Sequence, residues 1–188
     1  MKAAGIIGAA LVLALWTLPL EGSLGLFPAH MVRHMGLVAV AAPLLVLGFP
    51  RLAPAFAVSP LAAAVIEFAV VWGFHLPALH EAAALSTFWY VAEQGLFLLA
   101  GLLVWAGCLG AGGLAGAGGL LLTSMHMTLL GALLTLAPRP LYAATCLGSL
   151  AEQQLGGMLM LAIGTPVYLV AGLWLVGGAL NMTKDEAL

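Results

Sequence analysis

The sequence predicts an all-α, polytopic membrane protein with a bundle of about six transmembrane helices, because its composition and its long apolar runs both point to a bilayer. Of its 188 residues, 64% are hydrophobic and 6% are charged. A soluble globular domain carries about 25% charged residues. A run of about 20 apolar residues spans a bilayer as a helix, and the sequence lacks the ten-residue alternating segments of a membrane β-barrel. The composition therefore excludes a soluble enzyme, a nucleic-acid binder and a disordered protein.

The apolar runs predict a single transmembrane domain covering residues 1–188. The first run follows Lys2 and also fits a signal peptide, but its length and the lack of a small-x-small site before Glu21 favour a retained helix. The six predicted spans lie at residues roughly 3–20, 30–48, 58–76, 88–108, 119–137 and 151–178.

The basic residues predict the orientation of these spans. If six spans alternate, Lys2, Arg51 and Lys184 fall on one side, and Arg33 and Arg139 fall on the other. Cytoplasmic loops carry the excess of Lys and Arg. Both termini are therefore expected in the cytoplasm.

Two further features concern the connections between spans. The glycine-rich segment 110–119 predicts a flexible, low-complexity connection between the fourth and fifth spans. Cys108 is expected at the cytoplasmic end of a span and Cys146 in an outer loop, so the two thiols are not expected to pair.

A histidine and methionine pattern stands at the outer end of the second predicted span. His30 and His34 are four residues apart and therefore share one helical face. Met31 and Met35 repeat this spacing about 100° around the helix. Two imidazoles at this spacing can bind one metal ion, and nearby thioether sulfur favours a soft ion such as Cu(I). The alternative is a pair of interfacial histidines solvated by headgroups and water.

Two more histidines are expected at the same depth. His75 ends the third predicted span, and His80 follows in the outer loop beside Glu81. Pro77 should end the helix between them. Four histidines facing one aqueous side indicate metal capture or the edge of a haem, so we predict a metal site at His30, His34, His75 and His80.

Deeper positions carry a second set of candidates. Glu67 is expected to be a buried acid that either pairs with His126 or is protonated. Thioethers at matching depth in the fifth and sixth spans would hold or pass a thiophilic ion, although methionine also simply fills gaps in a core. The predicted secondary or transfer contacts are Met31, Met35, Met125, His126, Met127, Met158 and Met160.

Polar residues near the outer ends of the fourth and sixth spans predict a polar rim, comprising Glu93, Gln94, Glu152, Gln153 and Gln154. Capping of a helix start by the acidic group is the alternative role for Glu152. No nucleotide-binding Gly-x-x-x-x-Gly-Lys, Cys-x-x-Cys or Gly-x-Ser-x-Gly motif occurs. No catalytic residue is therefore predicted, and we do not expect an enzyme.

Four segments together resemble the membrane-embedded CtaG family. The double His-Met segment and the Gln-Gln-Leu-Gly-Gly segment are the specific ones, and the likeness covers roughly residues 24–175. The segments are Phe27–Met35 continuing to Ala42–Gly48, Trp72–Ala83, Gly131–Tyr142 and Glu152–Met160.

The resemblance implies a cytochrome c oxidase assembly factor of the bacterial inner membrane, associated with the copper centres of the oxidase. His30, His34, His75 and the group Glu152–Gln154 match family positions. The sequence departs from the family where Gln94 stands in place of an expected histidine, where Glu152 replaces an aspartate and where His80 replaces a tyrosine. It is also shorter than members with seven spans. An altered metal geometry, or compensation by His80, would follow from the change at Gln94.

The function predicted from these observations is copper binding and delivery during maturation of the oxidase metal centres. One alternative is a b-type haem electron carrier in which His34 and either His75 or His126 ligate the iron. A second alternative is a metal-free accessory subunit that packs against the oxidase, and a third is a transporter that moves an ion through Glu67 and His126. Expected partners are oxidase subunits and membrane lipid, with no nucleic acid, and the glycine-rich spans permit a homo-oligomer.

Overall fold

The computed structural model describes residues 2–142 and 148–185, and every regular element within these ranges is helical. The predicted all-α class is thereby confirmed. The elements are α1 (Lys2–Thr17), α2 (Glu21–Leu24), α3 (Leu26–Met35), the π-helix η1 (Gly36–Ala41), α4 (Ala42–Gly48), the 3₁₀-helix η2 (Ala53–Phe56), α5 (Pro60–Phe74), α6 (Pro77–Leu85), α7 (Thr87–Ala111), α8 (Gly113–Leu136) and α9 (Leu150–Asp185).

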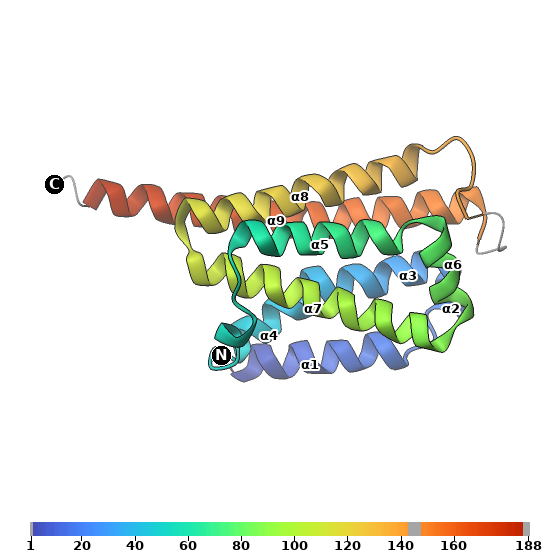
Figure 1. Cartoon of the computed structure of the whole chain (residues 1–188), viewed down its shortest axis with the longest axis horizontal. Helices are drawn as coiled ribbons and strands as arrows, with labels where there is room; N and C mark the ends of the chain where they lie inside the picture. Colours follow the sequence, from blue (N-terminus) through green and yellow to red (C-terminus); the bar gives the residue numbers. More distant parts are fainter. Residues whose placement is uncertain (1, 143–147, 186–188) are drawn as a thin grey trace.

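The helices form one elongated bundle. As Figure 1 shows, α1, the α3–η1–α4 segment, α5, α7, α8 and α9 all run along its long direction. The beginning of α1 and the end of α9 lie at one end of the bundle, and α2 and α6 lie at the other. Helices α2 and α6 therefore mark the end of the bundle at which α3 begins and α5 ends.

Four described segments are long and apolar enough to cross a membrane, and a fifth crossing results if the bent pair α5 and α6 forms one span. The predicted number of about six is therefore not confirmed. The difference arises at the predicted first span, because α1 has 16 residues and a length of about 24 Å. The hydrocarbon core is about 30 Å thick. The four segments are Leu26–Gly48, Thr87–Ala111, Gly113–Leu136 and Leu150–Asn181.

The glycine-rich segment 110–119 is mostly helical, so its prediction as a flexible connection was wrong. Helix α7 continues to Ala111 and α8 begins at Gly113, with Gly112 alone between them. Gly112 and Gly113 have φ values of +59° and +51°, a region that favours glycine. An unpaired backbone is costly in lipid, and this outweighs the low helix propensity of glycine. Cys108 is a buried free thiol, while Cys146 lies outside the described residues.

The π-helix η1 lies in the middle of the second predicted span and is tied to two other helices. The Val38 carbonyl accepts a hydrogen bond from Nε1 of Trp105 on α7 at 2.8 Å. The Tyr168 hydroxyl on α9 also lies 3.1 Å from this carbonyl. π-helical turns are rare and often occur near functional sites. Here the turn holds α7 and α9 against the segment that carries His30 and His34.

Helices α1 and α4 approach closely at two glycines. A Cβ atom built on Gly48 would overlap the backbone of Gly5. One on Gly5 would lie 2.7 Å from the Phe49 ring. The absence of side chains at these two positions is therefore what allows α1 to pack against the span that follows the π-helix.

We expect Gly48→Ala to destabilise the protein by about 1–3 kcal/mol, the usual cost of overpacking. The added methyl group would force α1 away from α4. The thermal unfolding midpoint of the detergent-purified protein, followed by circular dichroism, measures the effect. The control is Gly95→Ala in α7, where no atom lies within 4 Å of the added Cβ. This change should be neutral or stabilise by about 0.5–1 kcal/mol. Equal midpoints for the two variants would contradict the packing described here.

Candidate metal centre

Helix α3 carries the first two histidines of the candidate site. His34 is completely buried, and His30 is the more accessible of the two, with 12% of its side chain exposed. Their ring centroids are 6.2 Å apart. Phe97 of α7 stacks on the His34 ring at 4.1 Å with an interplanar angle of 19°. The predicted shared face is therefore present, and an aromatic ring from another helix holds one imidazole in place.

The third histidine lies at the bend between α5 and α6. A residue before proline prefers an extended backbone, and Leu76 has φ −67° and ψ 135°. The two helices consequently meet at 72°, and the predicted helix end before Pro77 is confirmed. Nδ1 of His75 lies 2.7 Å from the Val71 carbonyl. This bond places the ring proton on Nδ1 and leaves the lone pair of Nε2 free to bind a metal, as is typical of histidine ligands.

The structure brings the four predicted histidines together. The ring centroid of His30 lies 5.4 Å from that of His75 and 4.7 Å from that of His80, which α6 contributes. The His34 and His75 centroids are 5.2 Å apart. One ligand atom from each of His30, His34 and His75 lies within 4.8 Å of the other two. We call these three residues the inner set; they provide three imidazole ligands for one metal ion.

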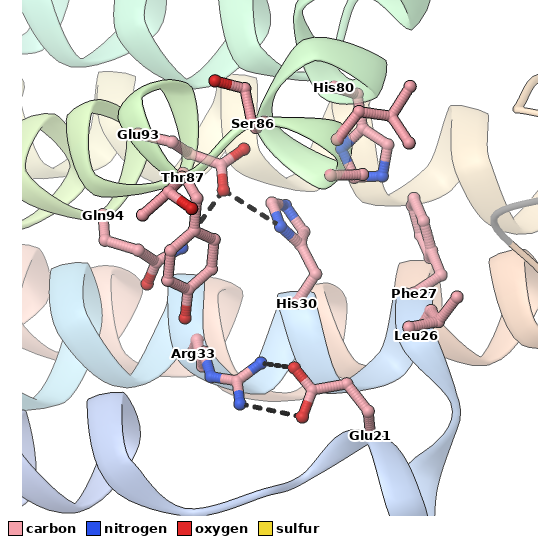
Figure 2. A pocket seen from close by; sticks show the side chains of 14 residues that line it. Glu21, Leu26, Phe27, His30, Arg33, His80, Ser86, Thr87, Glu93 and Gln94 are labelled. Carbon is pink, nitrogen blue, oxygen red and sulfur yellow. Dashed lines mark hydrogen bonds and ion pairs between the residues drawn. The ribbon is translucent and has the colours of Figure 1, made fainter. Parts of the chain in front are cut away.

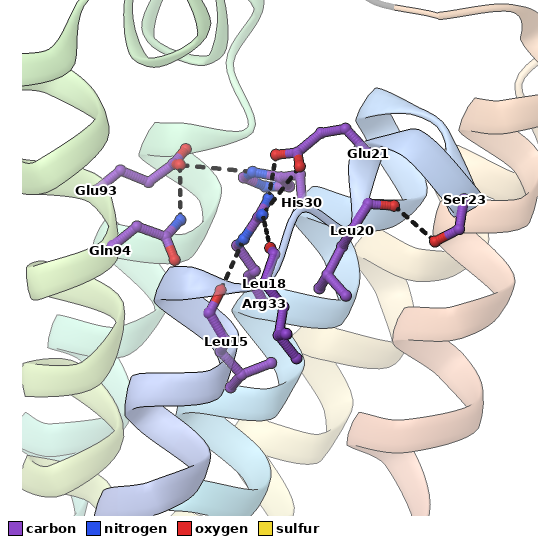
Figure 3. Close-up of polar contacts among 9 residues, drawn as sticks. All are labelled: Leu15, Leu18, Leu20, Glu21, Ser23, His30, Arg33, Glu93 and Gln94. Carbon is purple, nitrogen blue, oxygen red and sulfur yellow. Dashed lines mark hydrogen bonds and ion pairs between the residues drawn. The ribbon is translucent and has the colours of Figure 1, made fainter.

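Two polar residues of α7 also reach the cluster. Oε2 of Glu93 is 3.5 Å from Nδ1 of His30 and accepts a hydrogen bond from Nε2 of Gln94 at 3.1 Å. Figure 3 shows both contacts converging on the Glu93 carboxylate. His30, His80 and Glu93 also have ligand atoms within 4.8 Å of one another, and we call them the outer set. Gln94, at the position where a histidine was expected, thus orients a carboxylate.

A cavity of about 380 Å³ opens beside the outer set. Its lining includes His30, His80 and Glu93 together with Tyr90 and Arg33. Figure 2 shows the His30 ring between the Glu93 carboxylate and the His80 ring. His34 and His75 do not line this cavity. The outer set is therefore accessible from the cavity, whereas the inner set lies behind it.

Several buried polar atoms of the cluster lack a hydrogen-bond partner among the described residues. An unpaired buried polar group costs about 1–3 kcal/mol, and several in one place indicate a site for a ligand. Imidazole nitrogen is a good ligand for copper and zinc, and carboxylate oxygen is a harder one. The atoms are Nε2 of His30, both ring nitrogens of His34, Nε2 of His75, Nδ1 of His80, Oε1 of Glu93 and Oε1 of Gln94.

A partly buried ion pair at Arg33, in the last turn of α3, holds this helix next to the cluster. The Arg33 guanidinium donates to both carboxylate oxygens of Glu21 at 2.5 and 3.1 Å. It also donates to the carbonyls of Leu15 and Leu18 at 2.9 and 3.0 Å, as Figure 3 shows. Leu15 lies in the last turn of α1, where a helix leaves carbonyl acceptors without intrahelical partners, and Leu18 directly follows this helix. Arg33 therefore joins α1, α2 and α3 directly below the histidines.

Met31 and Met35 are completely buried on the side of α3 that faces α9. Met31 Cγ would lie 3.0 Å from a Cβ built on Gly156, and Met35 Cε would lie 2.8 Å from one on Gly164. Both thioethers therefore fill space beside glycines of α9. Whether either also contacts a metal stays a prediction.

The methionines of α8 and α9 are divided between the interior and the surface. Met127 and Met160 are completely buried, but Met125 is 68% exposed and Met158 is 47% exposed. Residues two apart on an α-helix point about 200° away from each other. The expected Met-x-Met pairs consequently cannot present both sulfur atoms to one ion, and Met125 and Met158 face outward.

Glu67 and His126 face each other in the core, as the sequence suggested. Oε2 of Glu67 is 3.9 Å from Nε2 of His126. Oε1 of Glu67 accepts a hydrogen bond of 2.8 Å from the Tyr168 hydroxyl. His126 belongs to neither the inner nor the outer set. These residues form a polar cluster separate from the four histidines.

The acidic and amide group at the start of α9 has a structural role. Ser149 and Glu152 form a reciprocal capping arrangement, with hydrogen bonds of 3.2 and 3.3 Å between side chains and backbone. Gln153 accepts from the Leu141 amide at 2.7 Å and donates to the Leu134 carbonyl at 3.2 Å. Neither Glu152, Gln153 nor Gln154 lines the cavity. The predicted rim is therefore divided, with Glu93 and Gln94 at the site and the other three residues at the helix start.

The sequence analysis did not identify three aromatic residues that support these clusters. Phe97 stacks on His34, Tyr142 donates to the His75 carbonyl at 2.9 Å, and Tyr168 bonds Glu67. The only sequence signal for them is a hydroxyl group or a large ring within an otherwise apolar run. Such a signal does not say which buried polar group the side chain contacts.

The family described as cytochrome c oxidase caa3 assembly factor (Caa3_CtaG) matches residues 3–181. The chain belongs to this family. The match includes all four histidines and Glu93, and it confirms the resemblance found in the sequence. No curated protein and no solved structure matches the chain. Membership in the family establishes the general role as an assembly factor for the oxidase.

The Arg33 ion pair predicts how stability depends on pH. The hydrogen bond from the Arg33 guanidinium lowers the pKa of Glu21 below its usual value. A lowered pKa in the folded state gives stabilisation that is complete above about pH 5 and is lost as the pH falls through the lowered value. We expect the unfolding midpoint of the wild-type chain to fall in acid by more than that of Glu21→Gln. Parallel pH profiles for the two proteins would disprove this coupling.

Proposed function

We propose that this chain binds copper at the four-histidine cluster and delivers it during maturation of a caa3-type cytochrome c oxidase. The observation that supports the proposal is the inner set, three imidazoles from α3 and the α5–α6 bend with ligand atoms within 4.8 Å. Family membership supplies the oxidase as the recipient. The role is non-enzymatic, because the ion passes through without chemical conversion.

Copper fits the ligands at this site better than a hard cation does. Imidazole suits copper and zinc, whereas carboxylate and carbonyl oxygens suit magnesium and calcium. The inner set contains imidazoles alone, and the hydrogen bond of His75 Nδ1 to Val71 orients Nε2 as outer hydrogen-bond partners do in metalloproteins. A cargo ion must also leave, and three ligands hold an ion less completely than a closed four-coordinate site.

The crowding of the rings favours a single ion over a haem. Axial ligation places a flat porphyrin between two histidines. The centroids of His30, His34 and His75 are 5.2–6.2 Å apart, and the Phe97 ring stacks directly on His34. These rings occupy the space into which the edge of a porphyrin would extend.

The arrangement of the bundle supports a site on the outer face of the bacterial inner membrane. His75 ends α5 and His80 belongs to α6, and α6 lies at the opposite end of the bundle from the beginning of α1 and the end of α9 (Figure 1). If both termini are cytoplasmic, as the distribution of Lys and Arg indicates, the cluster faces the periplasm. Copper would then be accepted and released without crossing the membrane.

Copper content of the purified protein tests the proposal. We expect the wild-type chain to retain copper after detergent purification, and we expect the double variant in which His30 and His34 are both changed to Ala to lower its content at least about 10-fold. Removing even an outer hydrogen-bond partner of a metal ligand has an effect of this size. Elemental analysis and an optical spectrum of the same sample also distinguish copper from haem, which gives a Soret band, and from a metal-free subunit.

The matched control is His126→Ala, which removes a buried histidine outside both ligand sets. Its copper content should equal that of the wild type. If the double variant of His30 and His34 retains as much copper as this control, the proposed site is wrong.

A further inference from the structure

The two ligand sets share one residue, His30. His30 belongs to both the inner set, with His34 and His75, and the outer set, with His80 and Glu93. A neutral imidazole has one lone pair for a metal. Two ions could bind together only if His30 lost its remaining ring proton. The sets are therefore two alternative positions for one ion.

The inner and outer positions differ in access. His30, His80 and Glu93 line the cavity of about 380 Å³, while His34 and His75 lie outside its lining. His34 is completely buried, and Phe97 covers its ring at 4.1 Å. An ion at the inner position would thus be shielded, and an ion at the outer position would be within reach of a recipient in the cavity.

The two positions also differ in ligand chemistry. The inner position offers three imidazoles, and the outer position offers two imidazoles and one carboxylate. Soft Cu(I) prefers nitrogen and sulfur ligands to carboxylate oxygen. The inner position should therefore hold Cu(I) more tightly, and the outer position should release it more readily.

The Glu93 carboxylate is oriented to act as a ligand at the outer position. The residue is only 1% exposed, its Oε2 faces His30 at 3.5 Å and accepts from Gln94 at 3.1 Å, and its Oε1 has no partner among the described residues. Figure 2 shows Glu93 and His80 on opposite sides of the His30 ring. The free oxygen and the free nitrogen at Nδ1 of His80 are thus available to one ion beside His30.

We infer that His30 passes a copper ion between a shielded inner position (His34, His75) and an outer release position (His80, Glu93) that opens into the cavity. This inference rests on the proposed copper function. The bonds to His34 and His75 break, bonds to a His80 nitrogen and a Glu93 oxygen form, and the bond to His30 persists. The oxidation state of copper does not change, so the step needs no electron donor or acceptor.

Release kinetics of the full-length, detergent-purified chain test the inference. The protein is loaded with one equivalent of Cu(I), and transfer to a coloured, Cu(I)-specific chelator is followed optically. We expect Glu93→Gln and His80→Ala to keep one copper per chain but to release it more slowly, because the outer position through which the ion leaves has lost a ligand. Changes around a metal site have effects of about 10-fold or more, and we expect a decrease in rate of this size. The control is Glu81→Gln, which changes a carboxylate next to His80 that belongs to neither set and should release copper at the wild-type rate.

Electron paramagnetic resonance of the Cu(II)-loaded proteins provides a second measurement. Coupling to three nitrogens is expected for Glu93→Gln, which retains the inner position, and coupling to two nitrogens is expected for His34→Ala, which retains the outer one. Wild-type release rates in both Glu93→Gln and His80→Ala would overturn the inference, as would two copper ions per wild-type chain or the loss of all copper from His34→Ala. A wild-type chain that binds no copper would instead overturn the proposed function itself.

Discussion

A polar group buried among apolar helices is costly unless another group satisfies it, and the organisation of this bundle follows from that constraint. Arg33 meets it through Glu21 and the carbonyls at the end of α1. Glu67 meets it through the Tyr168 hydroxyl. Several histidine ring nitrogens and one oxygen of Glu93 do not meet it within the described part of the chain. A cation there would supply the missing partners, so binding would couple directly to the stability of the fold.

The positions of the four histidines depend on two local features of the fold, an ion pair and a helix bend. The Arg33 ion pair fixes the last turn of α3 against α1 and α2. The 72° bend before Pro77 turns α6 over the end of the bundle and brings His80 beside His30. Neither the ion pair nor the bend itself contributes a candidate metal ligand. They support the site by positioning the helices that carry the candidate ligands, which is the role expected of a preorganising shell.

The sequence predicted the helical class, the helix end before Pro77 and the gathering of four histidines at one end, because each depends on apolar periodicity or on counting spans. It did not predict that Glu93 joins His30 and His80 in a second set of candidate ligands, since that depends on how α3, α6 and α7 are rotated against one another. Glu93 was accordingly assigned only to a polar rim. Met125 and Met158 face outward, apart from the buried Met127 and Met160, because a spacing of two residues separates side chains on a helix. The glycine-rich segment 110–119 was misjudged because composition does not reveal how costly an irregular backbone is in lipid.

The π-helix η1 allows the direction of the α3 histidines to change in evolution without a change in the packing of α4. A π-helical turn contains one residue more than the α-helical turn that it replaces. It therefore rotates the histidine-bearing α3 by about 100° relative to α4, while α4 keeps its glycine contact with α1. The rotation of α3, which carries His30 and His34, is therefore set independently of the rotation of α4, which packs against α1. An ancestral chain could alter the direction of its imidazoles by gaining or losing a single residue there, without rebuilding the packing of the rest of the bundle.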